Sequence, residues 1–160
     1  MTNLQLVFPE IFLSLSIMFL LILGVFKKNS SKIIQNLSLA VLLITAVITF
    51  NETISIKEVK LFNNSIIIDY LSSLMKIVTL LATFLVLIIS SNYLRTFKIF
   101  KIEYPILILS SVLGMMIMIN SNDLIVFYMG LELQSLALYV LATFNRDQIK
   151  SSEAGLKYFV

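Results

Sequence analysis

The chain has 160 residues, of which 59% are hydrophobic and only 13% are charged, and its mean hydropathy is +0.98. A soluble domain carries about a quarter charged residues, so this composition predicts a membrane protein; the basic residues are scattered between apolar runs, which excludes a nucleic-acid-binding face despite the net charge of +3. Because the chain has neither cysteine nor histidine, it excludes thiolate-bound iron–sulfur clusters, structural zinc and histidine-ligated haem within itself.

Five segments are long and apolar enough for membrane-spanning helices, each of which needs about 20 apolar residues to cross a hydrocarbon core about 30 Å thick. In chain order they are approximately residues 4–26, 33–50, 70–93, 104–120 and 123–144. The first contains Glu10 and lacks a basic leader, which distinguishes it from a cleaved signal peptide. Pro105 is tolerated in the first turn of the fourth helix, and Ser121, Asn122 or Asp123 can cap the fifth. The expected fold is therefore all-α.

Two shorter regions complete the expected organisation of a single membrane domain over residues 1–160. The stretch 61–68, LFNNSIII, has strand-like character and is expected to form a short hairpin or to lead into the third span. Residues 151–160, SSEAGLKYFV, are expected to start a further helix of a larger membrane protein. Ser151 or Ser152 is expected to cap this helix. Glu153 and Lys157 are expected to form a charged pair at positions i and i+4.

The distribution of basic residues predicts the orientation in the membrane. Alternate connections between the spans are rich in bases: Lys27, Lys28 and Lys32; Arg95, Lys98 and Lys101; Arg146 and Lys150. The long connection between the second and third spans balances Lys57 and Lys60 with Glu52, Glu58 and Asp69. The positive-inside rule then places the N-terminus on the outer side and the basic connections on the matrix or cytoplasmic side.

Glu132 lies near the middle of the fifth predicted span. It follows Asp123 by nine residues, which is about 13.5 Å along a helix. Three polar residues share its face of the helix, at i−4, i+3 and i+7: Tyr128, Ser135 and Tyr139. Gly130, on the same helix, can let another backbone come close. A lone ionised carboxylate at this depth is disfavoured by at least a few kcal/mol, so it needs a protein or water environment and a partner.

Two roles for Glu132 follow from the residues alone. A protonated, hydrogen-bonded carboxyl can serve only helix packing. Alternatively, desolvation disfavours the charged form of the carboxyl group while a nearby lysine favours it. Such a group can change protonation when that lysine moves, as a proton or ion path requires.

Three other charged positions have competing interpretations. Lys76 lies about 9 Å past Tyr70 and either snorkels to the interface or faces the interior. Glu10, about two turns into the first span, either lies at the interface, which is the simpler interpretation, or pairs with a neighbouring helix. Glu153 and Lys157 fit a surface pair or the entry to a buried chain of charges.

Two motifs carry a family resemblance. The runs GLELQSLALYVLATFNRD and SSEAGLKYFV closely resemble subunit 2 of the proton-pumping NADH:quinone oxidoreductase, respiratory complex I. LVFPEIFLSLSIMFLLILG and the run at 69–76, DYLSSLMK, are also similar to that subunit, whereas residues 28–66 are only compatible with it. The related antiporter-like subunits 4 and 5 share the glutamate, but the setting GLELQSLALY resembles subunit 2.

The resemblance implies roles for several residues. Glu132 would be one member of a buried charge pair in an antiporter-like half-channel, with a lysine on a later helix as its partner. Glu153 and Lys157 match residues near this path, and Lys76 is a further candidate. Tyr128, Ser135 and Tyr139 would give the path its polar lining.

The resemblance also implies the surroundings. Proton translocation would be coupled to electron transfer from NADH to ubiquinone, with FMN, iron–sulfur clusters and ubiquinone held elsewhere in the complex and no cofactor in this chain. The expected partners are other membrane-arm subunits, membrane lipids and a second chain that carries the remainder of the subunit. The expected location is the mitochondrial inner membrane or, alternatively, the bacterial plasma membrane.

Length is where the chain departs from the family, whose members have considerably more spans than five. The later lysines are missing, so we expect either a subunit split between two chains or a truncated product, with splitting favoured. Two alternatives remain open: a cation/proton antiporter subunit outside any redox complex, and a non-pumping remnant that scaffolds the membrane arm.

Overall fold

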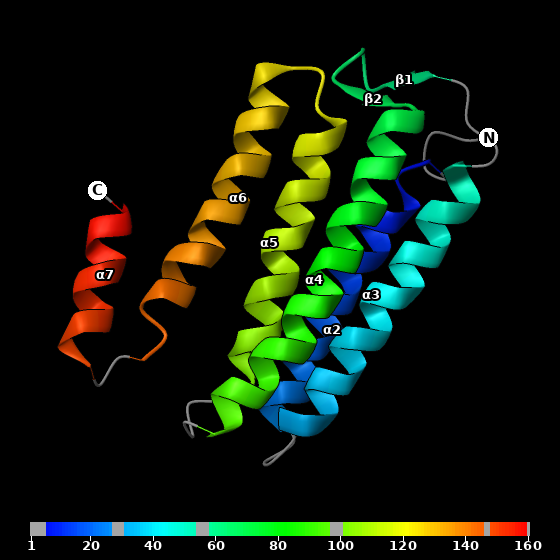
Figure 1. Ribbon diagram of the computed structural model, residues 1–160. Coiled ribbons are helices and arrows are strands. Elements are labelled where there is room, and N and C mark those ends of the chain that lie inside the picture. The colour runs from blue at the N-terminus through cyan, green and yellow to red at the C-terminus, as the bar shows by residue number, and fades with distance from the viewer. Residues whose placement is uncertain (1–5, 27–30, 54–57, 97–100, 146–147, 160) are drawn as a thin grey trace.

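A computed structural model describes residues 6–26, 31–53, 58–96, 101–145 and 148–159 (Figure 1). Six helices and a two-stranded hairpin make up these residues. In chain order they are α2 (Phe8–Phe26), α3 (Ser31–Thr53), β1 (Val59–Leu61), β2 (Ile66–Ile68), α4 (Tyr70–Thr96), α5 (Glu103–Asn120), α6 (Leu124–Ala142) and α7 (Ile149–Phe159).

The expected all-α fold with five helices of spanning length is confirmed. α2 to α6 are each long and apolar enough to cross a membrane, and each lies on one of the segments singled out in the sequence. α3 extends beyond the approximate segment 33–50 and continues to Thr53. This extension moves Glu52 from a connection into the last turn of a helix.

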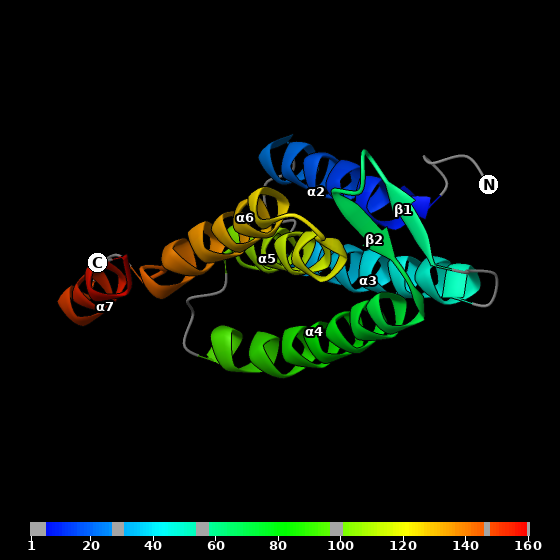
Figure 2. The same cartoon turned by 90° about the horizontal axis from the view of Figure 1, so that it is seen from above.

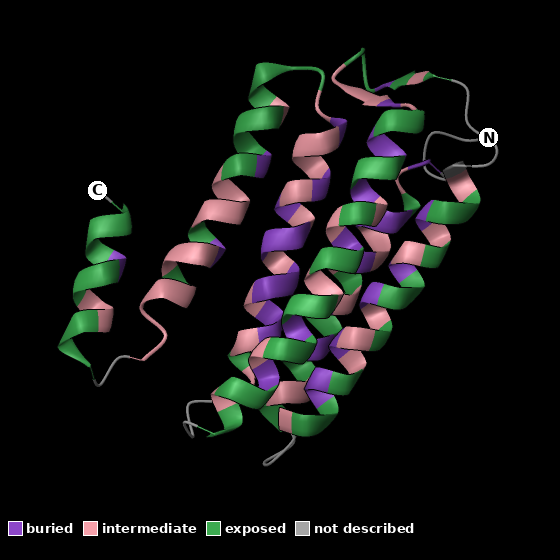
Figure 3. Ribbon diagram, in the orientation of Figure 1, coloured by how far each residue is buried: buried purple, intermediate pink, exposed green. Residues whose placement is uncertain are grey.

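The helices form a bundle in which α5 is central (Figures 1 and 2). α2 packs against α3 and α5, α4 packs against α3 and α5, and α6 packs mainly against the other side of α5. α5 is accordingly the most buried of the five long helices and α6 the least, as the colouring in Figure 3 shows. α7 contacts α6.

One apolar core joins α2, α3, α4 and α5. Most of its buried members recur at spacings of three, four, seven or eight residues, which places them on one face of each helix. They are Leu13, Ile17 and Leu20; Ile34 and Leu42; Leu80 and Leu87; and Ile106, Ile108, Leu109, Val112 and Met116. Lipid tails are as apolar as these side chains, so there is no hydrophobic driving force between the helices in a membrane. The packing therefore stabilises the bundle through close van der Waals contact.

Two glycines bring α5 and α6 into backbone contact. A Cβ on Gly114 would lie 2.7 Å from the carbonyl oxygen of Gly130 and 2.7 Å from the backbone nitrogen of Gln134. A Cβ on Gly130 would lie 2.9 Å from the carbonyl oxygen of Gly114. The predicted close approach at Gly130 is therefore confirmed, and it fixes which face of α6 is turned toward α5.

The predicted hairpin is present and covers one end of the bundle. Antiparallel β1 and β2 pair Val59 with Ile68 and Leu61 with Ile66. The three residues after β1 all have left-handed backbone angles: Phe62, Asn63 and Asn64. Asparagine tolerates this conformation well, which explains the turn at this point. The backbone N–H of Asn122 donates to the carbonyl of Ser65 over 2.9 Å, so the hairpin is tied to the connection between α5 and α6.

The first turns of the helices follow local capping chemistry, with one correction. Oδ1 of Asp69 accepts a hydrogen bond of 2.7 Å from the backbone N–H of Ser72 at the start of α4, and Asp123 caps α6. The prediction that Ser151 or Ser152 caps the last helix is wrong, because α7 already begins at Ile149.

The hydroxyl of Ser151 explains the difference. It donates a hydrogen bond of 2.9 Å to the carbonyl of Ala142 at the end of α6. This side chain therefore ties α7 to α6 and does not cap its own helix.

Candidate functional site

A buried ion pair links α2 to α4 near the hairpin end of the bundle. Nζ of Lys76 lies 2.6 Å from Oε1 of Glu10. Lys76 is 0% exposed and Glu10 7%. The interior interpretation of Lys76 is therefore confirmed, and the simpler interfacial interpretation of Glu10 is wrong.

The helix periodicity explains why the two charges meet. Glu10 begins the stripe of α2 that continues through Leu13 and Ile17 into the core. Lys76 lies on the stripe of α4 that continues through Leu80. Since both stripes point into the same interior, each charge finds its counterion there and not in water.

A further polar side chain belongs to this cluster. Nδ2 of Asn120, at the end of α5, donates a hydrogen bond of 2.8 Å to Oε1 of Glu10. Sequence reasoning missed Asn120; three helices therefore contribute to one buried cluster, formed by Glu10, Lys76 and Asn120. Glu52, in the last turn of α3, is half-buried.

Several polar atoms of the cluster have unused hydrogen-bonding capacity. Oε2 of Glu10 and Oδ1 of Asn120 are buried and accept no hydrogen bond from the described residues. Apart from its ion pair, Nζ of Lys76 also has no hydrogen-bond partner there, although an ammonium group has three N–H donors. Unsatisfied buried polar atoms are costly, and these three atoms are able to hydrogen-bond to water.

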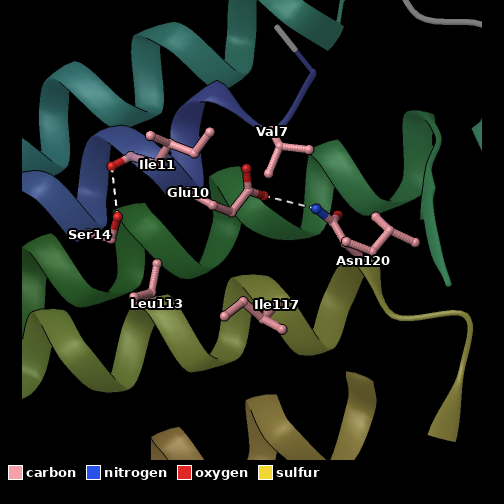
Figure 4. Close-up of a pocket in the computed structure, with 8 residues that line it drawn as sticks. Val7, Glu10, Ile11, Ser14, Leu113, Ile117 and Asn120 are labelled. Carbon is pink, nitrogen blue, oxygen red and sulfur yellow. Dashed lines mark hydrogen bonds between the residues drawn. The ribbon is translucent and has the colours of Figure 1, made fainter. Parts of the chain in front are cut away.

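A pocket of about 250 Å³ adjoins the cluster. Figure 4 shows Glu10 and Asn120 pointing toward one another beside it, with the hydrogen bond between them dashed. The remaining lining residues come from α2, α5, β2 and the turn before α2: Val7, Ile11, Ser14, Ile66, Leu113 and Ile117. The pocket thus lies between α2 and α5, beneath the hairpin.

Glu132 lies on a different part of the molecule. Gly130 and Ala137 are the buried residues of α6 and face α5; Glu132 is about 200° around the helix from Gly130. Its side chain is half-buried, and no salt bridge joins it to another of the described residues. Within the part of the chain that the structure describes, this carboxyl faces away from the bundle.

The three polar residues predicted to share its face have separate roles. The Ser135 hydroxyl donates a hydrogen bond of 3.0 Å to the backbone carbonyl of Glu132, not to its carboxyl group. Tyr139 packs edge-on against Tyr158 and Phe159 of α7. Tyr128 is 61% exposed. The structure therefore does not link these side chains to the carboxyl of Glu132 through hydrogen bonds.

The second predicted pair forms on the surface of α7. Nζ of Lys157 lies 2.7 Å from Oε1 of Glu153, and the side chains are 75% and 58% exposed. Within the described residues this arrangement is the surface pair considered above. Gly155, between them, packs on Thr143 so closely that a Cβ there would lie 1.8 Å from the methyl carbon of Thr143.

Several known proteins are similar to this chain. The profile of the family described as "NADH:quinone oxidoreductase/Mrp antiporter, TM" matches residues 121–160. The chain is 65% identical over 160 residues to the NADH-quinone oxidoreductase subunit N of Pelagibacter ubique, covering 100% of this chain and 34% of the relative. The similarity runs through all five long helices.

Two further relatives give the same result. The subunit N of Maricaulis maris is 44% identical, covering 99% of this chain and 33% of its own length. The subunit N of Bartonella bacilliformis is 45% identical, covering 99% of this chain and 32% of its own length. The chain spans about a third of the length of these relatives. They are bacterial and are named subunit N, whereas the motifs above pointed to the name subunit 2.

Proposed function

We propose that the chain is the N-terminal part of subunit N of a proton-translocating NADH–quinone oxidoreductase and that Glu132 takes part in moving protons. The identity of 65% to a subunit N, over the whole chain, is the observation that supports this most. The position of Glu132 fits the proposal, because its carboxyl lies on the least covered of the five long helices and needs a partner that the described residues do not supply.

The proposed mechanism uses a charge pair that can be made and broken. A lysine from the remainder of the subunit, in the same polypeptide or in a second chain, would lie against the outer face of α6. With the lysine close, Glu132 keeps its negative charge; when the lysine moves away, the desolvated carboxyl takes up a proton. Tyr128, Ser135 and Tyr139 would line the path of that proton, with Glu153 and Lys157 near its entry.

The rest of the complex would supply the redox chemistry. The flavin, iron–sulfur clusters and quinone site lie in other subunits under this proposal, since this chain has neither cysteine nor histidine to ligate a cluster. The bacterial relatives favour the bacterial plasma membrane over the mitochondrial inner membrane. The basic connections would face the cytoplasm, with the hairpin on the outer side.

A cation/proton antiporter subunit is the second candidate, because the matching family description names Mrp antiporters as well. The names of the most similar relatives favour the oxidoreductase. The chain could instead act only as a scaffold that does not pump. In that case neutralisation of Glu132 leaves proton movement unaffected, which distinguishes the scaffold from the oxidoreductase and the antiporter.

Purification of the native membrane assembly through an affinity tag on this chain separates the first two candidates. The proposal predicts that NADH–quinone reductase activity co-purifies with the tag and that vesicles containing the assembly take up protons only when NADH and quinone are supplied. Sodium–proton exchange without NADH, in an assembly that lacks reductase activity, would contradict it. The assembly purified through another reductase subunit is the matched comparison.

A further inference from the structure

We propose that the pocket between α2 and α5 is a water-binding site, in which water molecules complete the hydrogen bonding of Glu10 and Asn120. The pocket is lined by α2, α5, β2 and the turn before α2, whereas Glu132 lies on α6. The inference therefore concerns a part of the chain that the proposed function does not use, and it does not depend on that function.

The first argument is the hydrogen-bonding capacity that the pocket wall leaves unused. Glu10 and Asn120 are 7% and 3% exposed, and both line the pocket. Their mutual hydrogen bond uses Oε1 of Glu10 and Nδ2 of Asn120, so Oε2 and Oδ1 accept none from the described residues. The last torsion of either side chain is soft, so each oxygen can turn toward water in the pocket. Water supplies the donors that these buried oxygens lack.

The second argument is a third polar group and the room beside it. Ser14 lies one helical turn after Glu10 on the same face of α2. Its hydroxyl donates a hydrogen bond of 2.8 Å to the carbonyl of Ile11, and its oxygen is able to accept another. Figure 4 shows this bond and the bond from Asn120 to Glu10. A water molecule occupies about 30 Å³ in the liquid, so a pocket of about 250 Å³ has room for several.

The charge of the pocket wall favours water over a cation. Among the described residues that line the pocket, Glu10 alone is ionisable, and its Oε1 lies 2.6 Å from Nζ of Lys76. The ammonium of Lys76 thus already occupies the place that a sodium ion would take beside this carboxylate, and it would repel a second cation. A neutral hydrogen-bond donor meets no such repulsion.

A lipid tail is the competing occupant, because the other lining residues are apolar: Val7, Ile11, Ile66, Leu113 and Ile117. Cavities stay dry when their walls are apolar, whereas buried water occurs where two to four polar groups can hold it. A lipid tail would leave Oε2 of Glu10 and Oδ1 of Asn120 without a donor, which is costly in a buried site. Water satisfies both atoms.

Thiol labelling of the purified native assembly tests the proposal without NADH or proton pumping. The chain has no cysteine, so Ser14→Cys places a single thiol on the pocket wall. Leu15→Cys is the matched control, because Leu15 is the next residue and is 64% exposed on the outside of the bundle. The uncharged reagent methyl methanethiosulfonate reacts with the thiolate, which forms in water and is disfavoured in apolar surroundings. Mass spectrometry of this chain follows the labelling over time.

We expect Ser14→Cys to be labelled about tenfold faster than Leu15→Cys, or more, because its thiol ionises in contact with water. Labelling of Ser14→Cys that is no faster than that of Leu15→Cys would overturn the proposal, as a dry or lipid-filled pocket would give this result. Replacement of sodium by choline should leave the rate unchanged. A rate that rises when sodium is removed would mean that a cation occupies the pocket, and would also overturn the proposal.

Asn120→Leu, combined with Ser14→Cys, tests whether the polar wall holds the water. Leucine is close to asparagine in size but has no hydrogen-bonding group, so labelling should slow severalfold. Asn122→Leu is the matched control, because Asn122 is exposed and does not line the pocket. Unchanged labelling after Asn120→Leu would contradict the role of Asn120.

The comparison of Ser14→Cys with Leu15→Cys tests the water site even if the Asn120→Leu variant is not recovered in the assembly. It also separates this inference from the proposed function. If the tagged assembly lacks reductase activity but Ser14→Cys is labelled rapidly, the proposed function fails and the water site stands.

Discussion

Lys76 shows how a single charged residue can organise the hairpin end of the bundle. It is fully buried, and its ammonium group lies within salt-bridge distance of Glu10. The desolvation of two charges offsets much of their attraction, so the pair by itself adds little stability. Removal of one partner is different, because the other charge is then left buried without a counterion.

We accordingly expect Lys76→Met to lower the free energy of unfolding by about 3–5 kcal/mol, the usual effect of breaking a buried pair. The double variant Glu10→Gln/Lys76→Met removes both charges and should recover much of that loss. Thermal unfolding of the purified assembly, monitored through the loss of this chain from it, measures the stability of the single and the double variant. A double variant that is less stable than the single one would contradict this account.

The contact between α5 and α6 is decided by two glycines. Gly114 and Gly130 let the two backbones touch, and the resulting geometry turns Gly130 and Ala137 inward and leaves Glu132 on the other side of α6. A side chain at either glycine would meet backbone atoms, which cannot rotate away. The orientation of the proposed proton-transfer residue thus depends on residues that carry no functional group.

Gly114→Ala tests this dependence. Its Cβ would meet two backbone atoms at 2.7 Å, so the helices must move apart, and overpacking of this kind typically costs about 1–3 kcal/mol. Gly24→Ala is the matched control, since its nearest neighbours are side-chain atoms and not backbone: the branch methyl Cγ2 of Ile102 at 2.9 Å and the terminal methyl Cδ1 of Ile34 at 3.3 Å. Thermal unfolding should show a clear loss for Gly114→Ala and a smaller one for Gly24→Ala; equal losses would contradict the account.

At the scale of the whole molecule, local features of the sequence predicted most of the fold. The five long helices follow from apolar length, and the hairpin from the strand-like run around Asn63 and Asn64. The close approach at Gly130 was also predicted, because small residues favour helix contact in membranes. Each of these features depends on residues that are near one another in the chain.

Pairings over long distances could not be predicted in the same way. Glu10 and Lys76 are 66 positions apart, and which helices are neighbours decides whether they meet. Asn120 has no local signal of its own; only the hydrophobic stripes that contain Glu10 and Lys76 could have suggested the cluster. The start of α7 was misplaced because the Ser151 hydroxyl bonds to α6, a tertiary contact.

The whole bundle leaves α6 with one uncovered side, on which Glu132 lies, and this asymmetry supports the proposal that the remainder of the subunit docks there.

The central claim is that Glu132 moves protons. It is tested most directly by NADH-driven proton uptake into vesicles containing the complete assembly, with Glu132→Gln compared with Glu103→Gln, an exposed glutamate at the start of α5. We expect Glu132→Gln to assemble normally and to translocate fewer protons per NADH oxidised, with Glu103→Gln unchanged. Full proton translocation by the assembled Glu132→Gln variant would contradict the claim.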